Sequence, residues 1–301
     1  MRCIYCRPEG YATHRDGSEL TPDEIEALVT HMAVNHGLRK VRLTGGEPTT
    51  RPDLTQIIQR VGRIDGIKDL AMTTNGLTLV RQAGDLKSSG LKRINISLDS
   101  LDAKRFASIT GVDGLPRVLQ GIEACRSAGL WPVRINTVVV RGHNHEELPA
   151  LLEFAAKQDV EIRFIELMPM GPLHEKWGER YVPESEMREV LAGTVDFWQA
   201  LPSGSDSARR YRAALSNGRQ ASVGFITAMS HPFCDQCDRI RIGAGGELYP
   251  CLMDRPAGSM LPAIRPRFDP ELFDELLRNG LGKKAPEHPV RGHAVMIELG
   301  G

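Results

Sequence analysis

The stretch KVRLTGGEP, residues 40–48, decides the fold, because an apolar strand pattern ends there in a pair of glycines. A short apolar run that stops at glycine and proline is typical of a β-strand followed by a turn. A helical pattern follows over residues 53–64. Strand, loop and helix in this order predict one unit of a parallel sheet, since parallel strands need a crossover connection.

The same order recurs four more times along the chain. Strands are predicted over residues 70–73, 93–98, 132–140 and 161–166, and helical runs over residues 79–88, up to residue 128, over 146–157 and over 184–191. Gly90 and Gly129 follow two of these helical runs, as helix C-terminal stops do. This regular alternation predicts an α/β fold with parallel strands and crossover helices.

The first helix has a clear start. Thr21-Pro22-Asp23-Glu24 combines a capping threonine, a proline in the first turn and a glutamate three residues after the cap. We expect this helix to run to about His36 and to stop at Gly37. Every other unit begins with a strand, whereas only the loop of Cys3 and Cys6 precedes this helix. The pattern therefore indicates that a strand before the cysteine loop is missing.

The character of the chain changes near residue 170. Proline and glycine become frequent, residues 203–207 are small and polar, and strand patterns return over residues 221–227 and 239–242. Small polar stretches are typical of turns and loops. We therefore expect two domains, residues 1–170 and the less regular residues 171–301.

Composition excludes several classes of protein. The chain has 301 residues, of which 41% are hydrophobic, and its 38 basic and 38 acidic side chains give a net charge of zero. A general nucleic-acid binder usually shows a basic excess, and a membrane span needs about 18 consecutive apolar residues. The first residues lack the apolar segment of a secretory signal. We expect a soluble, cytoplasmic protein with no membrane partner.

The cysteines carry the first chemical signal. They form a group of two, a group of three and a single residue: Cys3 and Cys6; Cys234, Cys237 and Cys251; and Cys125. The lone cysteine lies in an apparent helix and is interpreted as a small buried hydrophobic residue. Without a secretion signal, the groups favour metal or redox chemistry over disulfides. A structural zinc site takes four ligands, whereas the first group offers two thiolates and the second offers three. These numbers favour two iron–sulfur clusters with open irons, or a truncated chain.

Two motifs resemble those of a known superfamily. Cys3-Ile4-Tyr5-Cys6 matches the last half of a C-x3-C-x2-C motif, and Thr44-Gly45-Gly46-Glu47-Pro48 stands at a strand end. Together they resemble the radical S-adenosylmethionine (SAM) enzymes, in which three such cysteines hold a [4Fe–4S] cluster and the cofactor chelates the fourth iron.

The chain is similar in particular to the GTP 3′,8-cyclase family of molybdenum cofactor biosynthesis, from Cys3 to Gly301. FCDQCDRIRIGAGGELYPCL, residues 233–252, resembles the segment with which that family binds a second [4Fe–4S] cluster, and the terminal Gly-Gly pair is also typical of it. The resemblance implies a partial (βα)6 TIM-like barrel of the radical SAM type, here with the first strand absent. It also implies a C-terminal α+β domain that carries the second cluster.

The resemblance also implies a reaction and its partners. A 5′-deoxyadenosyl radical takes hydrogen from the ribose C3′ of GTP, and the C3′ radical attacks guanine C8. The product is (8S)-3′,8-cyclo-7,8-dihydroguanosine 5′-triphosphate. The implied partners are GTP, a reductant such as flavodoxin or ferredoxin, and a downstream cyclic pyranopterin monophosphate synthase. The family is also compatible with a homodimer.

The same resemblance assigns site residues in three sets. The metal ligands are Cys3 and Cys6 for the radical cluster and Cys234, Cys237 and Cys251 for the second cluster. The residues around SAM are Tyr5, Gly46, Glu47, Ser97 and Met168. The residues around GTP are Arg42, Thr73, Arg134, Arg163, Arg239, Arg241, Gly300 and Gly301. Guanidinium groups suit phosphate oxygens, which agrees with the last set.

Several of these residues have simpler interpretations. A single arginine is most often a solvated surface group, and Thr73 can cap a turn. Ser97 can begin a turn, and Met168 can belong to the core. Arg134 stands where the family has lysine, so the geometry around the triphosphate can differ.

The first cysteine of the radical motif would lie four residues before Cys3, ahead of Met1. We therefore expect a start-site error or a truncated chain. An inactive or different-substrate radical SAM paralogue remains an alternative. Two others are a radical enzyme that acts on a peptide with the help of an auxiliary cluster, and a zinc-binding module without enzymatic activity.

Overall fold

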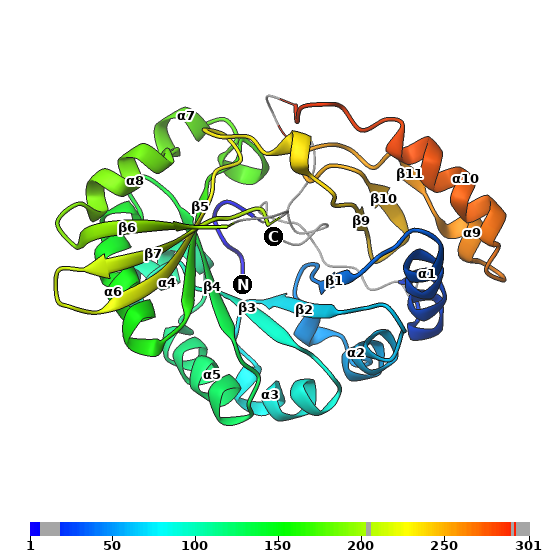
Figure 1. The fold of residues 1–301 in the computed structure, drawn as a ribbon, viewed down its shortest axis with the longest axis horizontal. Helices are drawn as coiled ribbons and strands as arrows, with labels where there is room; N and C mark the ends of the chain where they lie inside the picture. The colour runs from blue at the N-terminus through cyan, green and yellow to red at the C-terminus, as the bar shows by residue number, and fades with distance from the viewer. Residues whose placement is uncertain (7–18, 203–205, 290–291, 293–301) are drawn as a thin grey trace.

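The computed structural model describes residues 1–6, 19–202, 206–289 and 292. Its main feature is one sheet with the strand order β1-β2-β3-β4-β5-β8-β7-β6. The strands are β1 (Lys40–Leu43), β2 (Asp69–Thr74), β3 (Arg93–Ser97), β4 (Val133–Val139), β5 (Glu161–Glu166), β6 (Val195–Leu201), β7 (Arg209–Leu215) and β8 (Gln220–Ile226). β1 to β5 and β8 pair parallel, and β7 and β6 continue the sheet antiparallel. Figure 1 shows this sheet curved into a partial barrel with helices along its outer side.

Helices connect the strands in the predicted alternation. They are α1 (Pro22–Asn35), α2 (Leu54–Gly62), α3 (Leu79–Ser88), α4 (Ala103–Thr110), α5 (Leu115–Ser127), α6 (Leu148–Gln158), α7 (Trp177–Arg180), α8 (Glu184–Leu191), α9 (Leu261–Ile264) and α10 (Pro270–Leu281). The 3-10 turns are η1 (Pro48–Thr50), η2 (His145–Glu147), η3 (Gly171–Leu173) and η4 (Cys234–Gln236). The α/β fold is therefore confirmed, and Cys125 is fully buried in α5 as expected.

The first helix begins and ends as its sequence predicts. The Glu24 backbone N–H donates to the Thr21 hydroxyl over 3.2 Å, and the Thr21 N–H donates to the Glu24 carboxylate over 2.8 Å. These two bonds satisfy backbone donors that the first turn leaves without helical partners. After the C-cap His36, Gly37 adopts a φ of +68°, which glycine does without strain.

The two faces of the sheet differ in chemistry. The outward side chains, such as Met72, Ile94 and Ile135, belong to the apolar core beneath the helices. The alternate residues on the inner face are polar, among them Arg93 and Arg134. A TIM barrel usually fills its interior with branched apolar side chains. The polar inner face therefore indicates a binding surface.

Two strands of the sheet have no clear signal in the sequence. β6 lies at the edge of the sheet, so most of its side chains are exposed, and β7 carries three arginines. Neither strand shows the strict alternation of a half-buried strand. β7 pairs with β8, which itself lies parallel to β5, and β6 pairs in turn with β7, so both strands extend the barrel sheet beyond β8.

The remaining residues form a small second sheet that packs beside α1. Its strands are β9 (Arg241–Ile242), β10 (Glu247–Tyr249) and β11 (Gly258–Ser259), in the order β11-β10-β9. Leu248 of β10 and Phe273 of α10 belong to the same apolar core as the barrel. Figure 1 shows α9 and α10 close to α1. The start and the end of the described chain therefore share one core.

The first residues also lie against the barrel. The backbone N–H groups of Arg2 and Ile4 donate to the carbonyls of Thr110 and Ile109, over 2.7 and 2.9 Å. These bonds hold the cysteine loop at the end of α4. Among the residues that the structure describes, no helix combines the length and apolar character that a membrane crossing requires.

Candidate functional site

The two cysteine groups approach one apolar cluster. Met170, Tyr249 and Met253 form this cluster, and both Cys6 and Cys251 pack against it. Met168, predicted to lie near SAM, contacts the same cluster. The fold thus places a cysteine from each group on one wall, although 245 positions (251 − 6) separate them in the sequence.

A tight turn holds the first cysteine pair. The Cys6 N–H donates to the Cys3 carbonyl over 2.9 Å, and the buried Tyr5 hydroxyl donates to Asp99 Oδ2 over 2.7 Å. Burial, followed by the charges of Asp99 and Cys6, raises the pKa of the Cys3 thiol to about 12. A bound cation favours the thiolate, so this buried sulfur suits a metal ligand. The described residues supply two thiolates here, those of Cys3 and Cys6.

The second cysteine group stands around the β9–β10 hairpin. Cys234 begins η4, Cys237 follows it, and pairing of Tyr249 with Arg241 brings Cys251 back beside them. Burial opposes ionisation of the Cys237 thiol. The N–H and charge of Arg239 and the charge of Lys284 outweigh burial and lower its pKa.

This donor set fits an iron–sulfur cluster. Lys284 Nζ lies 3.6 Å from the Cys237 sulfur, and none of the described cysteines forms a disulfide. Cations that stabilise thiolates also balance the negative charge of a thiolate-ligated cluster. The buried Arg239 Nε has no hydrogen-bond partner in the described part of the chain, so a donor beside the thiolates is left for an acceptor from a ligand.

Glu47 of the glycine loop ties two strand ends together. Its carboxylate accepts bonds from the Thr49 N–H and hydroxyl, from the Thr74 hydroxyl at 2.6 Å and from the Asn75 N–H at 2.7 Å. The loop after β1 is thereby fixed to the end of β2. Gly46 beside it is exposed, so its backbone is open to a ligand.

The predicted arginines gather on the inner face of the sheet. Arg163 is 2% exposed and pairs with Glu161 at 2.5 Å and with Asp206 at 2.8 Å. Arg134 Nε lies 3.4 Å from Glu161. Burial, together with the charges of Arg93, Arg163 and Arg134, lowers the pKa of Arg42 to about 10, although Asp206 opposes this shift. Every arginine here stays charged near neutral pH, because arginine pKa values start so high.

Arg42 differs from its neighbours in its pairing. Within the described residues it makes no hydrogen bond or ion pair, and its side chain stays open to solvent although protein atoms and other arginines surround it. Arg93, by contrast, is paired with Asp69 at 2.5 Å. A charged fork without a protein partner is suited to an incoming phosphate.

Three polar groups of this face were not among the predicted site residues. These buried atoms find no hydrogen-bond partner among the residues described: Arg93 Nη1, Asn95 Oδ1 and Asn136 Oδ1. Buried polar atoms are rarely left unsatisfied unless a ligand or water meets them. Their signal in the sequence was the alternation of RINIS and VRINTVV, which puts them on the same face as Arg134.

The other predicted residues are spread around this face. Thr73 is buried and accepts a 3.2 Å hydrogen bond from Asn95, and Ser97 is half-buried at the end of β3. Arg241 lies in β9, where burial and the charge of Arg239 lower its pKa. Gly300 and Gly301 lie outside the described residues. The Gly292 N–H donates to the Pro169 carbonyl over 3.0 Å, so the chain ahead of them passes the end of β5.

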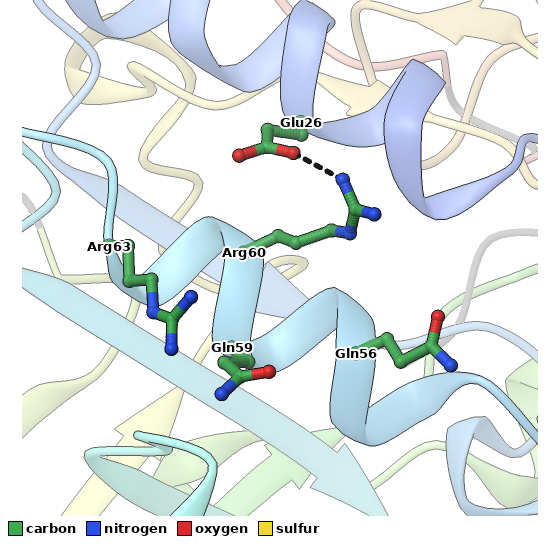
Figure 2. A pocket seen from close by; sticks show the side chains of 5 residues that line it. All are labelled: Glu26, Gln56, Gln59, Arg60 and Arg63. Carbon is green, nitrogen blue, oxygen red and sulfur yellow. Dashed lines mark hydrogen bonds and ion pairs between the residues drawn. The ribbon is translucent and has the colours of Figure 1, made fainter.

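A hollow on the outer side of the barrel has a different character. Figure 2 shows it between α1 and α2, with Arg60 and Glu26 paired at 2.6 Å across it. None of the predicted site residues that the structure describes lines it. The chemistry of the chain therefore concentrates on the inner face and not there.

Comparison with known proteins agrees with this geometry. Residues 1–155 match the model of the radical SAM superfamily, and residues 160–290 match that of Molybdenum Cofactor Synthesis C. The structure of Streptococcus suis SuiB bound to S-adenosylmethionine shares the fold, with a TM-score of 0.61 at 14% identity over 84% of this chain and 57% of that one. The curved parallel sheet with a cysteine loop and a glycine loop is that of a radical SAM enzyme.

Proteins of similar sequence identify the family to which the chain belongs within the radical SAM class. A GTP 3′,8-cyclase of Pelotomaculum thermopropionicum is 38% identical over all of this chain and 94% of its own length. One from Marinobacter nauticus is 38% identical over 97% of this chain and 87% of its own. The chain belongs to the GTP 3′,8-cyclase family of radical SAM enzymes. It is thus an enzyme of molybdenum cofactor biosynthesis whose cofactors are SAM and two [4Fe–4S] clusters.

Proposed function

We propose that this chain converts GTP to (8S)-3′,8-cyclo-7,8-dihydroguanosine 5′-triphosphate. The observation that carries the proposal is the packing of Cys6 and Cys251 against the cluster of Met170, Tyr249 and Met253. A cofactor site and a second cluster site on one wall can hold a nucleotide between them. The cyclase relatives favour this reaction over a peptide substrate or an inactive paralogue.

The metal ligands and the SAM site follow the predicted sets. Cys3 and Cys6 bind the radical cluster, and Cys234, Cys237 and Cys251 bind the second one. When bound, SAM and its reduced cluster supply a primary carbon radical. Gly46, Ser97 and Met168 line the cofactor. Tyr5 and Glu47 give the cofactor site its shape, because their polar atoms are already used. The Tyr5 hydroxyl bonds to Asp99, and the Glu47 carboxylate bonds to the end of β2.

The inner face binds the triphosphate and orients the ribose. Arg42 is the first contact of the phosphates, since its guanidinium has no protein partner among the described residues. Behind Arg42 on the same face lie Arg134, Arg163 and Thr73. Arg239 and Arg241 hold the base beside the second cluster, and Gly300 and Gly301 complete the site. The arginines exclude water by occupying the polar positions around the substrate.

The net change of the substrate is defined. The ribose C3′–H bond and the π bond between C8 and N7 of guanine break, a bond forms between C3′ and C8, and N7 gains a hydrogen as one electron and one solvent proton. The balance needs two electrons in all, one for SAM cleavage and one for the final reduction. A low-potential carrier such as flavodoxin or ferredoxin supplies them. A downstream cyclic pyranopterin monophosphate synthase takes the product.

We also propose the organisation in which this takes place. Residues 1–170 carry the radical chemistry and residues 171–301 carry the second cluster and the base-binding arginines. The two family matches, which meet between residues 155 and 160, support a division near that point. The enzyme works in the cytoplasm, and we propose a homodimer as its form in solution.

An isotope experiment tests the reaction. The anaerobic, cluster-loaded protein is incubated with SAM, a reductant and GTP deuterated at C3′, with GTP deuterated at C1′ as the control. We expect 5′-deoxyadenosine to carry one deuterium only from the first substrate. Release of unlabelled 5′-deoxyadenosine from both substrates would show that GTP C3′ is not the site of abstraction.

A further inference from the structure

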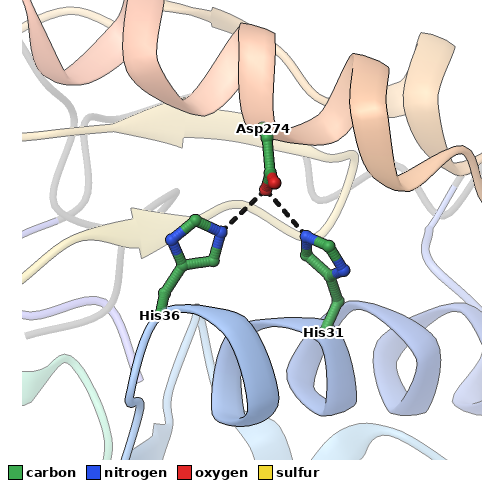
Figure 3. A group of neighbouring side chains, drawn as sticks. All are labelled: His31, His36 and Asp274. Atoms are coloured by element: carbon green, nitrogen blue, oxygen red, sulfur yellow. Dashed lines mark hydrogen bonds and ion pairs between the residues drawn. The ribbon is translucent and has the colours of Figure 1, made fainter.

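A group of three side chains outside the proposed active site has metal-ligating chemistry. His31 of α1 and the C-cap residue His36 both point toward Asp274 of α10, as Figure 3 shows. Each imidazole Nε2 lies 2.7 Å from the same oxygen, Asp274 Oδ1. The three donor atoms all lie within 4.8 Å of one another. No function derived above uses these residues.

The surroundings hold the ligands in position. The ring of His31 packs against Phe268 and Phe273, with ring centroids 5.4 and 5.3 Å apart. Its other nitrogen, Nδ1, lies 3.1 Å from the Asn35 side-chain amide. Metal-binding histidines usually have such an outer partner, which fixes the ring orientation.

Charge and access also suit a cation. Within the described residues, the Asp274 carboxylate has no lysine or arginine partner, and its side chain is 35% exposed. The His31 and His36 side chains are 10% and 31% exposed, so an ion can reach the group from solvent. The C-terminal end of α1 adds partial negative charge there.

We propose that His31, His36 and Asp274 form a zinc site between α1 and α10. Two imidazole nitrogens and one carboxylate oxygen suit Zn²⁺, and a water molecule would fill the fourth position. On binding, each neutral imidazole moves its proton from Nε2 to Nδ1 and stays neutral. Asn35 then turns its amide oxygen toward His31 Nδ1, where it accepts the hydrogen bond that Nδ1–H donates. The ion clamps the first described helix to the last.

The site lies away from the cysteines, and that separation makes the test selective. The protein is prepared anaerobically with its clusters in place, equilibrated with buffered Zn²⁺, and analysed for zinc and iron together. We expect one zinc per chain with no loss of iron. Asp274→Asn and His36→Gln should each weaken zinc binding by at least about tenfold, since each removes one of three ligands.

The control is His174→Gln, which replaces an exposed histidine whose side chain makes no hydrogen bond or ion pair within the described residues. It should leave the zinc content unchanged. If the ligand variants bind zinc as the wild type does, the metal sits elsewhere and the proposal is wrong. It is equally wrong if the wild type takes up no zinc even at millimolar concentration.

A diffraction experiment tests the proposed zinc site without any substitution. Diffraction data collected just above the zinc edge from zinc-soaked, cluster-loaded crystals should show an anomalous peak between His31, His36 and Asp274. An empty position there, with the two histidines still bonded to the carboxylate, would reduce the group to a hydrogen-bonded latch.

Discussion

Arg163 keeps its charge at 2% exposure because two carboxylates meet its guanidinium, Glu161 at 2.5 Å and Asp206 at 2.8 Å. Breaking such a buried pair leaves an unpaired charge, which is strongly destabilising. Arg163 therefore supports the inner face, whereas Arg42 has no ion-pair partner among the described residues. This difference between two arginines leads to the first prediction.

Replacing Arg42 with methionine should weaken GTP binding and leave the fold intact. One charged hydrogen bond is worth about 1.5–3 kcal/mol, so the dissociation constant should rise roughly 10- to 100-fold. Stability should not fall, because burial and neighbouring arginines already lower the pKa of Arg42. Calorimetric titration of the cluster-loaded protein measures the affinity.

The matched control is Arg81→Met, in an exposed arginine of α3 on the outer side. That variant should bind GTP as the wild type does. Equal weakening by both variants would mean that Arg42 acts only through the overall charge of the protein.

Replacing Cys234, Cys237 and Cys251 with serine should remove one cluster. The iron content should fall by about four atoms per chain, because a [4Fe–4S] cluster needs these thiolates. Iron and sulfide analysis after anaerobic reconstitution measures the change. Cys125→Ser is the control, since this cysteine is buried within α5 and contacts no cysteine group. An unchanged iron content in the triple variant would exclude a second cluster at this hairpin.

Among the elements, α1 connects the two halves of the described chain. Glu24 in its first turn pairs with Arg265 Nε at 2.5 Å, and Arg265 also donates to the Glu19 carbonyl at 3.0 Å. The Leu20 N–H donates to the Ala244 carbonyl over 2.7 Å. Four residues of sequence predict the cap of α1, but they do not predict that Glu24 pairs with Arg265.

Glu24→Gln should lower the unfolding free energy by about 1 kcal/mol, the upper end for a partly exposed pair. The pair with Arg265 lowers the pKa of Glu24 from 4.5 to about 2. A carboxyl group with a lowered pKa contributes its full stability above its unfolded pKa and loses it as the pH falls toward the folded value. The effect should therefore be the same at about pH 8 and about pH 5.5.

Urea unfolding followed by tryptophan fluorescence at both pH values measures this effect. Glu26→Gln on the same helix is the control, because Glu26 pairs with Arg60 across the surface and both side chains are more than a third exposed. It should have a smaller effect. A loss that changes between the two pH values would assign the stability to another group.

At the scale of the whole molecule, η3 reaches back to the cysteine loop. Gly171 adopts a φ of +68°, and a Cβ atom there would lie 2.5 Å from the Tyr5 carbonyl oxygen. The backbone after β5 thus packs directly on the turn that carries Cys3 and Cys6. This contact joins residues on either side of the proposed domain boundary.

Gly171→Ala should displace the cysteine loop and weaken SAM binding. The left-handed backbone alone costs a non-glycine residue about 1 kcal/mol, and the clash with a backbone oxygen adds to it. Equilibrium binding of SAM to the anaerobic protein measures the effect. Gly178→Ala is the matched control, because a Cβ there meets nothing within 4 Å. Unchanged SAM affinity in Gly171→Ala would separate η3 from the cofactor site.

The sequence by itself determined those features of this protein that depend on residues close together along the chain. The strand–helix alternation, the cap at Thr21 and the stop at Gly37 follow from local backbone preferences and the periodicity of apolar side chains. The cysteine spacings and the glycine loop indicated the chemistry for the same reason, since a motif is a local pattern.

Only the tertiary structure decided which charges are paired and which segments meet. Asp206 neutralises Arg163, whereas Arg42 pairs with none of the residues that the structure describes, and no pattern within β1 or β5 shows that difference. The pairing of β6 with β7, the approach of Cys6 to Cys251 and the group of His31 with Asp274 join residues far apart in the sequence. Such contacts depend on how the whole chain folds around one core, and local preference does not encode them.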